Sequence, residues 1–598
     1  MTSWPGRALL LAGAALLVAI PALSQEAPES LLPEGFGDPE ALPPPAPKAP
    51  GQSPAPSQPG APVPVIAPPL PLPEIGEGED VPPPEDLQPV NYFTIPEGRA
   101  RPVDLVGPLE PGNYGLGRDA FGPNQGALLA QVMRRLDAPL PSRWTSILLR
   151  RALLSRVAAP AGVNPVDWVA ERADLLLRMG EADGARMLVQ SVDQEFYTPR
   201  MIEVAGQAAL ATADPAALCP LVGPARQLSR DMVWTLAEAM CASLESEPAR
   251  AAALIDQARR GEGSRSIDLA LAEKVVGAGA ETRRSVAIVW DGVETLTPWR
   301  FGLASATGTA VPENLLAGAG PRVQAWFARA PMVPLDQRLQ AASVAAALGV
   351  FSSHSLGEIH SLILDQTDVA ETGGTIGARL RTAWVGGSPG DRVTALRTLW
   401  TEPTDLRERY ARLILTAGAA TRIPAASDYA GDAPNLVSAM LSAGFDADAA
   451  RWAAVVQDGG DDRAWAMLAL GSPRPAVDMS AGRVGTFIGN DESADKQRSQ
   501  LLVGALVGLG RISDAEGQQL AQAAGLEVGG TDIWTDAIDR AARERRPGTV
   551  ALLAGLAMQT PDWSGVPPRY FFRIIRALRA VGLDYEARMI AAEAMARA

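Results

Sequence analysis

From position 143 onward, apolar side chains recur at intervals of three and four positions, which places them on one face of an α-helix. Trp144, Ile147 and Leu154 show this spacing in the first such segment. The next segment, Asp167–Met179, stops before a glycine, and Glu181–Val192 has the pattern of a partner helix. Strict alternation of apolar and polar positions, which would indicate strands, is almost absent. The pattern therefore predicts an all-α chain.

A loose repeat runs through this helical region: an apolar residue, a glycine four positions later and an alanine five positions after the glycine. The glycine fits the point where a helix ends, because it tolerates the left-handed conformation that closes a helix. The alanine would fall in the first turns of the next helix, where a larger side chain would push the two helices apart. For any single copy, chance in a chain rich in alanine and glycine is the alternative. The five copies are Leu176 with Gly180 and Ala185, Met440 with Gly444 and Ala449, Met467 with Gly471 and Ala476, Leu506 with Gly510 and Ala515, and Leu578 with Gly582 and Ala587.

Weaker copies, Ala211 with Ala216 and Leu244 with Ala249, lack the glycine, and the intervals between copies scatter around the mid-thirties. This spacing, with glycine and alanine five positions apart, resembles the tetratricopeptide repeat (TPR), and Gly582–Ala587 is the closest match. The resemblance covers about residues 143–260 and 431–598. It implies a superhelical stack of antiparallel helix hairpins, an α-solenoid, whose usual use is to bind other proteins.

The central part, residues 261–430, is predicted to contain more helix pairs with less regular turns. Pro321 and Pro334 stand where helices would begin, because proline fits the first turn of a helix. Residues 143–598 also exceed what one compact core usually holds, and a stack of hairpins avoids that limit. Helices are expected over Asp268–Val276, Thr297–Ala306, Arg322–Ala330, Leu335–Leu348 and Arg379–Trp384.

The first 24 residues have the order of a secretory signal: Arg7 alone carries charge, an apolar run follows, and Ser24–Gln25 offers a cleavage site. An uncleaved membrane anchor is the alternative. Residues 25–90 are rich in proline, alanine and glutamate and are expected to form a disordered linker. Residues 91–142 are expected to be transitional and partly ordered. The sequence thus predicts an exported protein, and the periplasm is its expected location.

The net charge of −15 is unevenly distributed. Residues 25–99 contain twelve acidic residues against Lys48 and Arg99, whereas the helical remainder is close to balance. No basic face of the kind that nucleic-acid binding requires is visible. No later segment has the apolar length that spans a bilayer, so no stable membrane insertion is expected after cleavage.

The two cysteines, Cys219 and Cys241, are 22 positions apart. In an oxidising compartment an even pair favours a disulfide. Neighbouring antiparallel helices could bring the two thiols together. A redox-active pair is the alternative, but such pairs are typically Cys-x-x-Cys. We therefore expect a structural disulfide.

Candidate catalytic residues are few. His354 and His360 are six positions apart, which turns them away from each other on a helix, and both are expected to be solvated. Ser493-Ala494-Asp495-Lys496 matches a Ser-x-x-Lys motif but lacks its companion elements. The acidic runs Asp365–Glu371 and Asp458–Asp462 lack calcium-loop spacing and are expected to be exposed loops. No catalytic residue, metal site or cofactor is predicted.

The thirteen tryptophans outnumber the seven tyrosines. At helix-packing positions tryptophan favours a core role, although aromatic grooves also bind sugars and peptides. The sequence therefore predicts a non-enzymatic scaffold that binds other proteins of the cell envelope. The alternative is a protein that acts on or binds peptidoglycan or another glycan, through scattered carboxylates and tryptophans.

Overall fold

The computed structural model describes residues 99–262, 266–279 and 286–598, which belong to one unit, Gln88–Ala598. The predicted signal over residues 1–24, its cleavage site at Ser24–Gln25 and the proline-rich segment over residues 25–90 lie outside the described residues. The described part of residues 91–142 packs on the helices that follow, because Phe121 is buried and its ring meets Trp168 edge-on at 5.2 Å.

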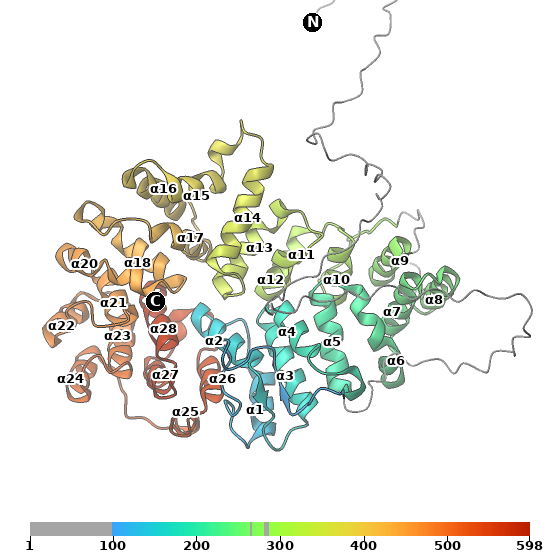
Figure 1. Cartoon of the computed structure of the whole chain (residues 1–598), viewed down its shortest axis with the longest axis horizontal. Helices are drawn as coiled ribbons and strands as arrows, with labels where there is room; N and C mark the ends of the chain where they lie inside the picture. Colours follow the sequence, from blue (N-terminus) through green and yellow to red (C-terminus); the bar gives the residue numbers. More distant parts are fainter. Residues whose placement is uncertain (1–98, 263–265, 280–285) are drawn as a thin grey trace, which may run out of the picture. The chain divides into compact units, whose positions relative to one another are not determined.

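Secondary structure in the described ranges is helical apart from one pair of two-residue strands (Figure 1). Strand β1 (Leu105–Val106) runs antiparallel to β2 (Val157–Ala158). The prediction of an all-α chain is therefore confirmed at the level of fold class.

The helices of the first part of the unit begin at capping residues such as Asn164 and Thr198, whose side chains accept backbone N–H groups and are followed by proline. They are α1 (Gly126–Arg135), α2 (Arg143–Leu154), α3 (Pro165–Arg178), α4 (Ala182–Val189), α5 (Pro199–Ala211), α6 (Cys219–Leu228), α7 (Met232–Leu244), α8 (Pro248–Glu262) and α9 (Ile267–Gly279), with 3-10 turns η1 (Gln194–Phe196) and η2 (Pro215–Leu218).

In the central part, each of the five predicted helices has a counterpart, and Pro321 is the first residue of α12. Helices α11, α14, α16 and α17 were not predicted. The central helices are α10 (Pro298–Ala306), α11 (Glu313–Gly318), α12 (Pro321–Arg329), α13 (Leu335–Leu348), α14 (Ser353–Gln366), α15 (Ile376–Val385), α16 (Pro389–Thr401) and α17 (Leu406–Ala420), with η3 (Thr372–Gly374).

The remaining helices continue to the end of the sequence. They are α18 (Ala433–Ser442), α19 (Asp446–Ala450), α20 (Ala453–Gly459), α21 (Asp462–Gly471), α22 (Ala481–Asn490), α23 (Gln497–Gly508), α24 (Asp514–Ala524), α25 (Ile533–Arg543), α26 (Pro547–Ala557), α27 (Pro568–Ala580) and α28 (Asp584–Arg597), with η4 (Ser427–Asp432), η5 (Ala494–Lys496) and η6 (Trp563–Gly565).

Four of the five repeat glycines end a helix in the left-handed conformation. Gly180, Gly444, Gly510 and Gly582 have φ between +64° and +89°. At Gly180, its own N–H reaches the Leu177 carbonyl (3.0 Å) and the next N–H reaches the Leu176 carbonyl (2.9 Å). These two bonds form a Schellman closure of the helix C-terminus.

The copy with Gly471 and Ala476 is a wrong prediction. Gly471 is the last helical residue of α21, and its φ is not positive. Ala476 lies in the loop before α22. The glycine instead allows close packing, because a Cβ there would meet Leu441 at 3.0 Å.

For the copy that ends at Ala449, the prediction of a buried small residue is confirmed, but the prediction of a full partner helix is wrong. Ala449 is fully buried and lies four positions after the N-cap Phe445. It was expected in the first turns of a full partner helix, but α19 ends one residue later and has only five residues. The backbone N–H groups of Arg451 and Trp452 bond to carbonyls three positions back, which tightens the chain and interrupts the helix before α20. This turn places the fully buried Trp452 in the core.

The alanine prediction is also wrong at Ala515, which is exposed. In the copies at Ala185, Ala449 and Ala587 the N-cap residue directly follows the glycine, and the buried alanine lies four positions after that cap. After Gly510 the cap is Ser513, two positions later than in those copies, so Gly517 takes the packed position against Val507. The position relative to the N-cap, rather than to the glycine, decides which residue must be small.

Helix α2 connects the first and last parts of the unit, because it packs on α26, on α28 and on α13. We call its polar centre the Glu593 junction. Glu593 of α28 is 4% exposed. Its carboxylate accepts hydrogen bonds from the Ser142 hydroxyl (2.7 Å), the backbone N–H groups of Arg143 (2.9 Å) and Trp144 (3.1 Å), the Tyr410 hydroxyl (3.4 Å) and the Arg597 guanidinium (2.8 Å).

Arg143 extends this junction to two more helix ends. Its buried guanidinium donates to the carbonyls of Ser442 (3.2 Å), Ala346 (2.8 Å) and Phe351 (3.2 Å). Burial lowers the pKa of Arg143, and the nearby Glu593 opposes that shift. A stack in which each hairpin contacts only its neighbours does not account for these contacts.

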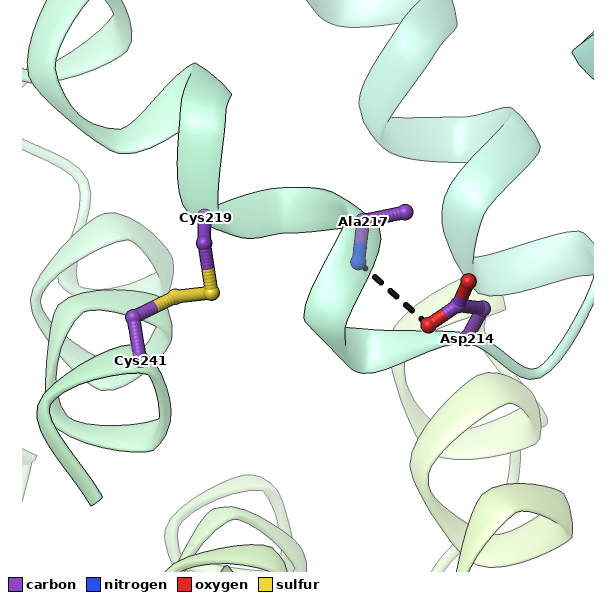
Figure 2. The surroundings of a disulfide bond; sticks show 4 residues. All are labelled: Asp214, Ala217, Cys219 and Cys241. Atoms are coloured by element: carbon purple, nitrogen blue, oxygen red, sulfur yellow. Dashed lines mark hydrogen bonds between the residues drawn. A yellow bond between two sulfur atoms is a disulfide. The ribbon is translucent and has the colours of Figure 1, made fainter. Parts of the chain in front are cut away.

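A second hydrophobic cluster is built from α6–α9 with parts of α5 and α10. We call α6–α9 with η2 the disulfide lobe, because Cys219 and Cys241 are bonded in it, with Cα atoms 5.5 Å apart (Figure 2). The expected pairing of the cysteines is thus present in the structure. Asp214 caps the turn before Cys219 by accepting the Ala217 N–H (3.4 Å) and also pairs with Arg186 of α4.

Candidate functional site

The residues considered as catalytic candidates in the sequence, the two histidines and the Ser-x-x-Lys motif, do not assemble into a catalytic set. His354 is exposed on α14, but His360 is 6% exposed, so the prediction that both histidines are solvated is wrong for His360. Burial, with a smaller contribution from Arg412, lowers the pKa of His360 to about 4. His360 lies on the side of α14 that packs on α13 and α17.

The Ser-x-x-Lys residues also act locally. Ser493 Oγ accepts the backbone N–H of Arg498 (3.1 Å), and Lys496 Nζ donates to the Ile488 carbonyl (3.0 Å). A nucleophile must lie within hydrogen-bond reach of its base. Because these two side chains bind different backbone groups, the motif stabilises the start of α23.

One cavity in the described structure is an open groove of about 800 Å³. We call it the α14 groove, because α14 forms one wall and α15 and α17 form the other, with Phe445 also in the lining. Helices α14 and α15 are each packed on α17, which holds the two walls together. The groove lies in the central part of the chain, for which the sequence predicted only irregular helix pairs.

One wall of the α14 groove is a polar stripe. His354, Glu358, Ser361 and Asp365 line it, and their spacing of four, three and four positions aligns them on one face of α14. Asp365 and Gln366 are therefore helical, and the expectation that Asp365–Glu371 is a loop is wrong at its first two positions. The same expectation for Asp458–Asp462 is wrong at Asp458 and Asp462, which lie in α20 and α21. Within the described part of the chain, His354, Glu358 and Asp365 form no hydrogen bond or ion pair.

The other wall is aromatic and apolar. Trp384 of α15 is 39% exposed, more than any other tryptophan in the described ranges. A Cβ at Gly418 of α17 would lie 2.6 Å from the indole, so the ring rests directly on that helix backbone. The Arg422 guanidinium lies 5.5 Å from the centre of the indole ring, a cation–π contact that holds the ring in place.

This arrangement favours binding over catalysis. No hydrogen bond in the described residues joins His354 to a serine or a carboxylate, as an activated nucleophile would require. An exposed aromatic ring opposite unpaired polar groups is the composition of a binding groove. Arg381 of α15, which also lacks a partner in this part of the chain, adds a donor to the aromatic wall.

A second groove of about 510 Å³ lies on the other side of α14, between α12, α13 and α17. His360 and Arg412 line it, and Arg412 donates to Glu408 (2.9 Å). Unlike the α14 groove, this groove has no tryptophan, tyrosine or phenylalanine in its described lining.

Sequence reasoning did not bring the α14 groove together, although it named some of its parts. It placed Trp384 at the end of a predicted helix and treated His354 as a solvated histidine. The missed signal is the stripe Glu358, Ser361 and Asp365, which continues the helical spacing from His354. The packing of α15 against α14, over a short loop, has no equally clear signal.

Comparisons with models of known protein families, with curated proteins and with solved structures find no match to this chain. Among the helices that the structure describes, none has both the length and the apolar character needed to cross a membrane. In the same residues, no group of three or more His, Cys, Asp and Glu side chains is arranged to hold a metal ion.

Proposed function

We propose that this protein is a binding scaffold and that the α14 groove takes up a polypeptide segment of a partner protein. The observation that carries the proposal is the exposed Trp384, which lies across a groove of about 800 Å³ from a polar stripe whose His354, Glu358 and Asp365 form no hydrogen bond or ion pair in the described residues. An extended peptide presents apolar side chains together with backbone donors and acceptors, and such a groove can satisfy both.

We also propose that the helix pairs are TPR-like and that the protein works in the cell envelope after export. The four left-handed glycine turns and the small residues packed after them support the first part. The signal-like residues 1–24 and the Cys219–Cys241 bond support the second, because disulfides persist in oxidising compartments. Sequencing the N-terminus of the mature protein tests export, and we expect it to begin at Gln25.

A photo-crosslinking residue placed at Ser361, in the α14 groove, tests the binding proposal in intact cells. Gln519, exposed on α24, is the matched control position. We expect polypeptide adducts from Ser361 that Trp384→Ala abolishes, and none from Gln519. Adducts at both positions, or adducts that ignore Trp384→Ala, would contradict the proposal.

A glycan ligand is the second candidate, because an exposed tryptophan beside a carboxylate also suits a sugar ring and its hydroxyl groups. The same crosslinking experiment separates the two. Protease removes a polypeptide adduct, whereas a peptidoglycan adduct resists protease and is removed by a glycan hydrolase.

A further inference from the structure

The charges of the α14 groove define its ligand more closely, on the premise that the proposed peptide binding is correct. Glu358 and Asp365 are exposed, unpaired in the described residues and on the same stripe of α14. They are seven positions apart, and a helix rises 1.5 Å per residue, so the two carboxylates are separated by about 10 Å along the groove.

A polyproline II segment has three residues per turn and rises about 3.1 Å per residue, so side chains three positions apart lie on the same face about 9 Å from each other, close to the spacing of the two carboxylates. We infer that the ligand is a polypeptide segment in the polyproline II conformation, with two basic side chains three positions apart and an apolar side chain between them. The basic groups pair with Glu358 and Asp365, and charge-assisted hydrogen bonds of this kind are the stronger ones.

The apolar side chain of the ligand packs on Trp384. Gly418 and Arg422 already hold the indole from the protein side, so the ring loses little conformational freedom when a ligand covers it. Leu380 and Leu415 also line the groove but are almost fully buried, so Trp384 is the main apolar contact for a ligand.

Arg381 on the same wall fits a peptide rather than a simple polycation. A guanidinium has only donors, so a basic side chain cannot pair with it, whereas the backbone carbonyls of an extended peptide can. The groove thus holds acceptors for the two basic side chains on α14 and a donor for the peptide backbone on α15.

The test uses fluorescently labelled peptides and the purified mature protein, with binding followed by anisotropy. The probe contains Lys-Pro-Leu-Lys between alanines. One control peptide has Glu in place of both Lys, and a second has the two Lys adjacent, as Lys-Lys-Pro-Leu. We expect the probe to bind at least about tenfold more tightly than either control, with affinity that falls as salt is raised.

Two variants complete the test. Glu358→Gln with Asp365→Asn should weaken the probe about tenfold, whereas Glu313→Gln with Asp536→Asn removes two exposed carboxylates on α11 and α25 and should leave binding unchanged. Equal binding of the basic and acidic peptides, or of the two lysine spacings, would overturn this inference. If those peptides still depended on Trp384, the proposed function would stand; if no peptide bound in a Trp384-dependent way, both would fall.

Discussion

The Glu593 junction and the disulfide lobe are held together by different means. At the junction, one buried carboxylate binds groups from residues more than 400 positions away in the sequence. In the disulfide lobe, the covalent bond joins residues 22 positions apart, and α7 packs mainly on α8 and α9, its neighbours in sequence. The first region depends on long-range polar contacts, and the second on local packing and a crosslink.

The difference has a thermodynamic consequence. A buried carboxylate is tolerated only when its partners compensate for lost hydration, so removing one partner leaves the others unsatisfied. A disulfide acts mainly by restricting the unfolded chain, so its loss leaves the folded contacts in place. Damage at the junction should therefore reach helices from both ends of the unit, whereas damage in the lobe should stay local.

The largest effect is expected from Glu593→Leu. The substitution leaves the buried first N–H groups of α2 without their acceptor. It also removes the carboxylate partner of Arg597, which among the described residues keeps only its hydrogen bond to the Pro141 carbonyl, and breaking a buried pair in this way costs about 3–5 kcal/mol. Chemical denaturation measures the loss. Hydrogen exchange should show weaker protection in α2 and α28 together.

The control for this variant is Glu402→Leu, which breaks the partly exposed pair with Arg379. Such pairs contribute about 1 kcal/mol or less. If Glu593→Leu cost no more than Glu402→Leu, the junction would not hold the two ends of the unit together.

Removing the disulfide with Cys219→Ser and Cys241→Ser should lower the free energy of unfolding by about 3 kcal/mol, because the loop between them gains freedom when unfolded. Protection from hydrogen exchange should fall in α6–α9 and stay unchanged in α28. An equal loss of protection in α28 would show that the lobe and the junction unfold as one unit. Thiol labelling of the denatured, non-reduced wild-type protein should find no free cysteine.

The sequence predicted the features that depend on local chemistry. Gly180, Gly444, Gly510 and Gly582 were identified because a left-handed helix end selects glycine. The cysteine pairing followed from compartment and an even count. The copies with errors, at Gly471, Ala449 and Ala515, are places where the turn or the helix after it changes length, which apolar spacing does not encode.

The sequence prediction missed left-handed turns of two kinds. Gly308, Gly349 and Gly525 are glycine turns outside the five copies, and other missed turns carry residues other than glycine. Ala213 and Ser246 have φ of +54° and +64° and close α5 and α7 with the same two bonds as the glycine turns. They lie two positions after Ala211 and Leu244, where the weaker copies had placed the turns. Glycine is preferred in this conformation but is not the only residue that adopts it, so its absence hid these turns.

The Glu593 junction and the α14 groove could not be predicted, because both depend on which helices meet. Nothing in the sequence near Glu593 indicates that α28 lies at the N-terminus of α2. The contact between α28 and α2 depends on tertiary packing, whereas the sequence repeat predicts only each helix and the turn that follows it.

The pH dependence of stability should distinguish the buried His360 from the exposed His354 on the same helix. The pKa of His360 is lowered to about 4 in the folded state, against about 6.5 when unfolded. Between these values only the unfolded state binds the proton, so stability is complete above pH 6.5 and falls as pH decreases towards 4. The loss from pH 6.5 to 5 should be about 1.5 kcal/mol.

The measurement is the unfolding free energy of wild type and of His360→Gln at each pH from 5 to 7.5. The difference between the two proteins removes the contribution of the carboxylates, which both contain. We expect the variant to lack the part of the slope of unfolding free energy against pH that His360 contributes. His354→Gln is the matched control, because His354 is exposed on the same helix, and it should keep the wild-type slope. A slope that persists in His360→Gln would mean that His360 is accessible to protons in the folded state.

The smallest effect is expected from alanine substitutions at two glycine turns. One turn packs against α2 and α28, and the other is open to solvent. Gly444 and Gly582 have nearly the same φ, +85° and +83°, so alanine should bring a similar left-handed strain of about 1 kcal/mol to both. At Gly444 the added Cβ would also overlap the Tyr585 hydroxyl and lie 3.1 Å from Trp144, whereas no atom lies within 4 Å at Gly582. Gly444→Ala should therefore cost about 1 kcal/mol more than Gly582→Ala in chemical denaturation.

Adding Tyr585→Phe, which removes the hydroxyl, should recover most of that difference. Equal costs for the two alanine variants would mean that Gly444 is required by its backbone conformation alone and not by the close approach of α2 and α28.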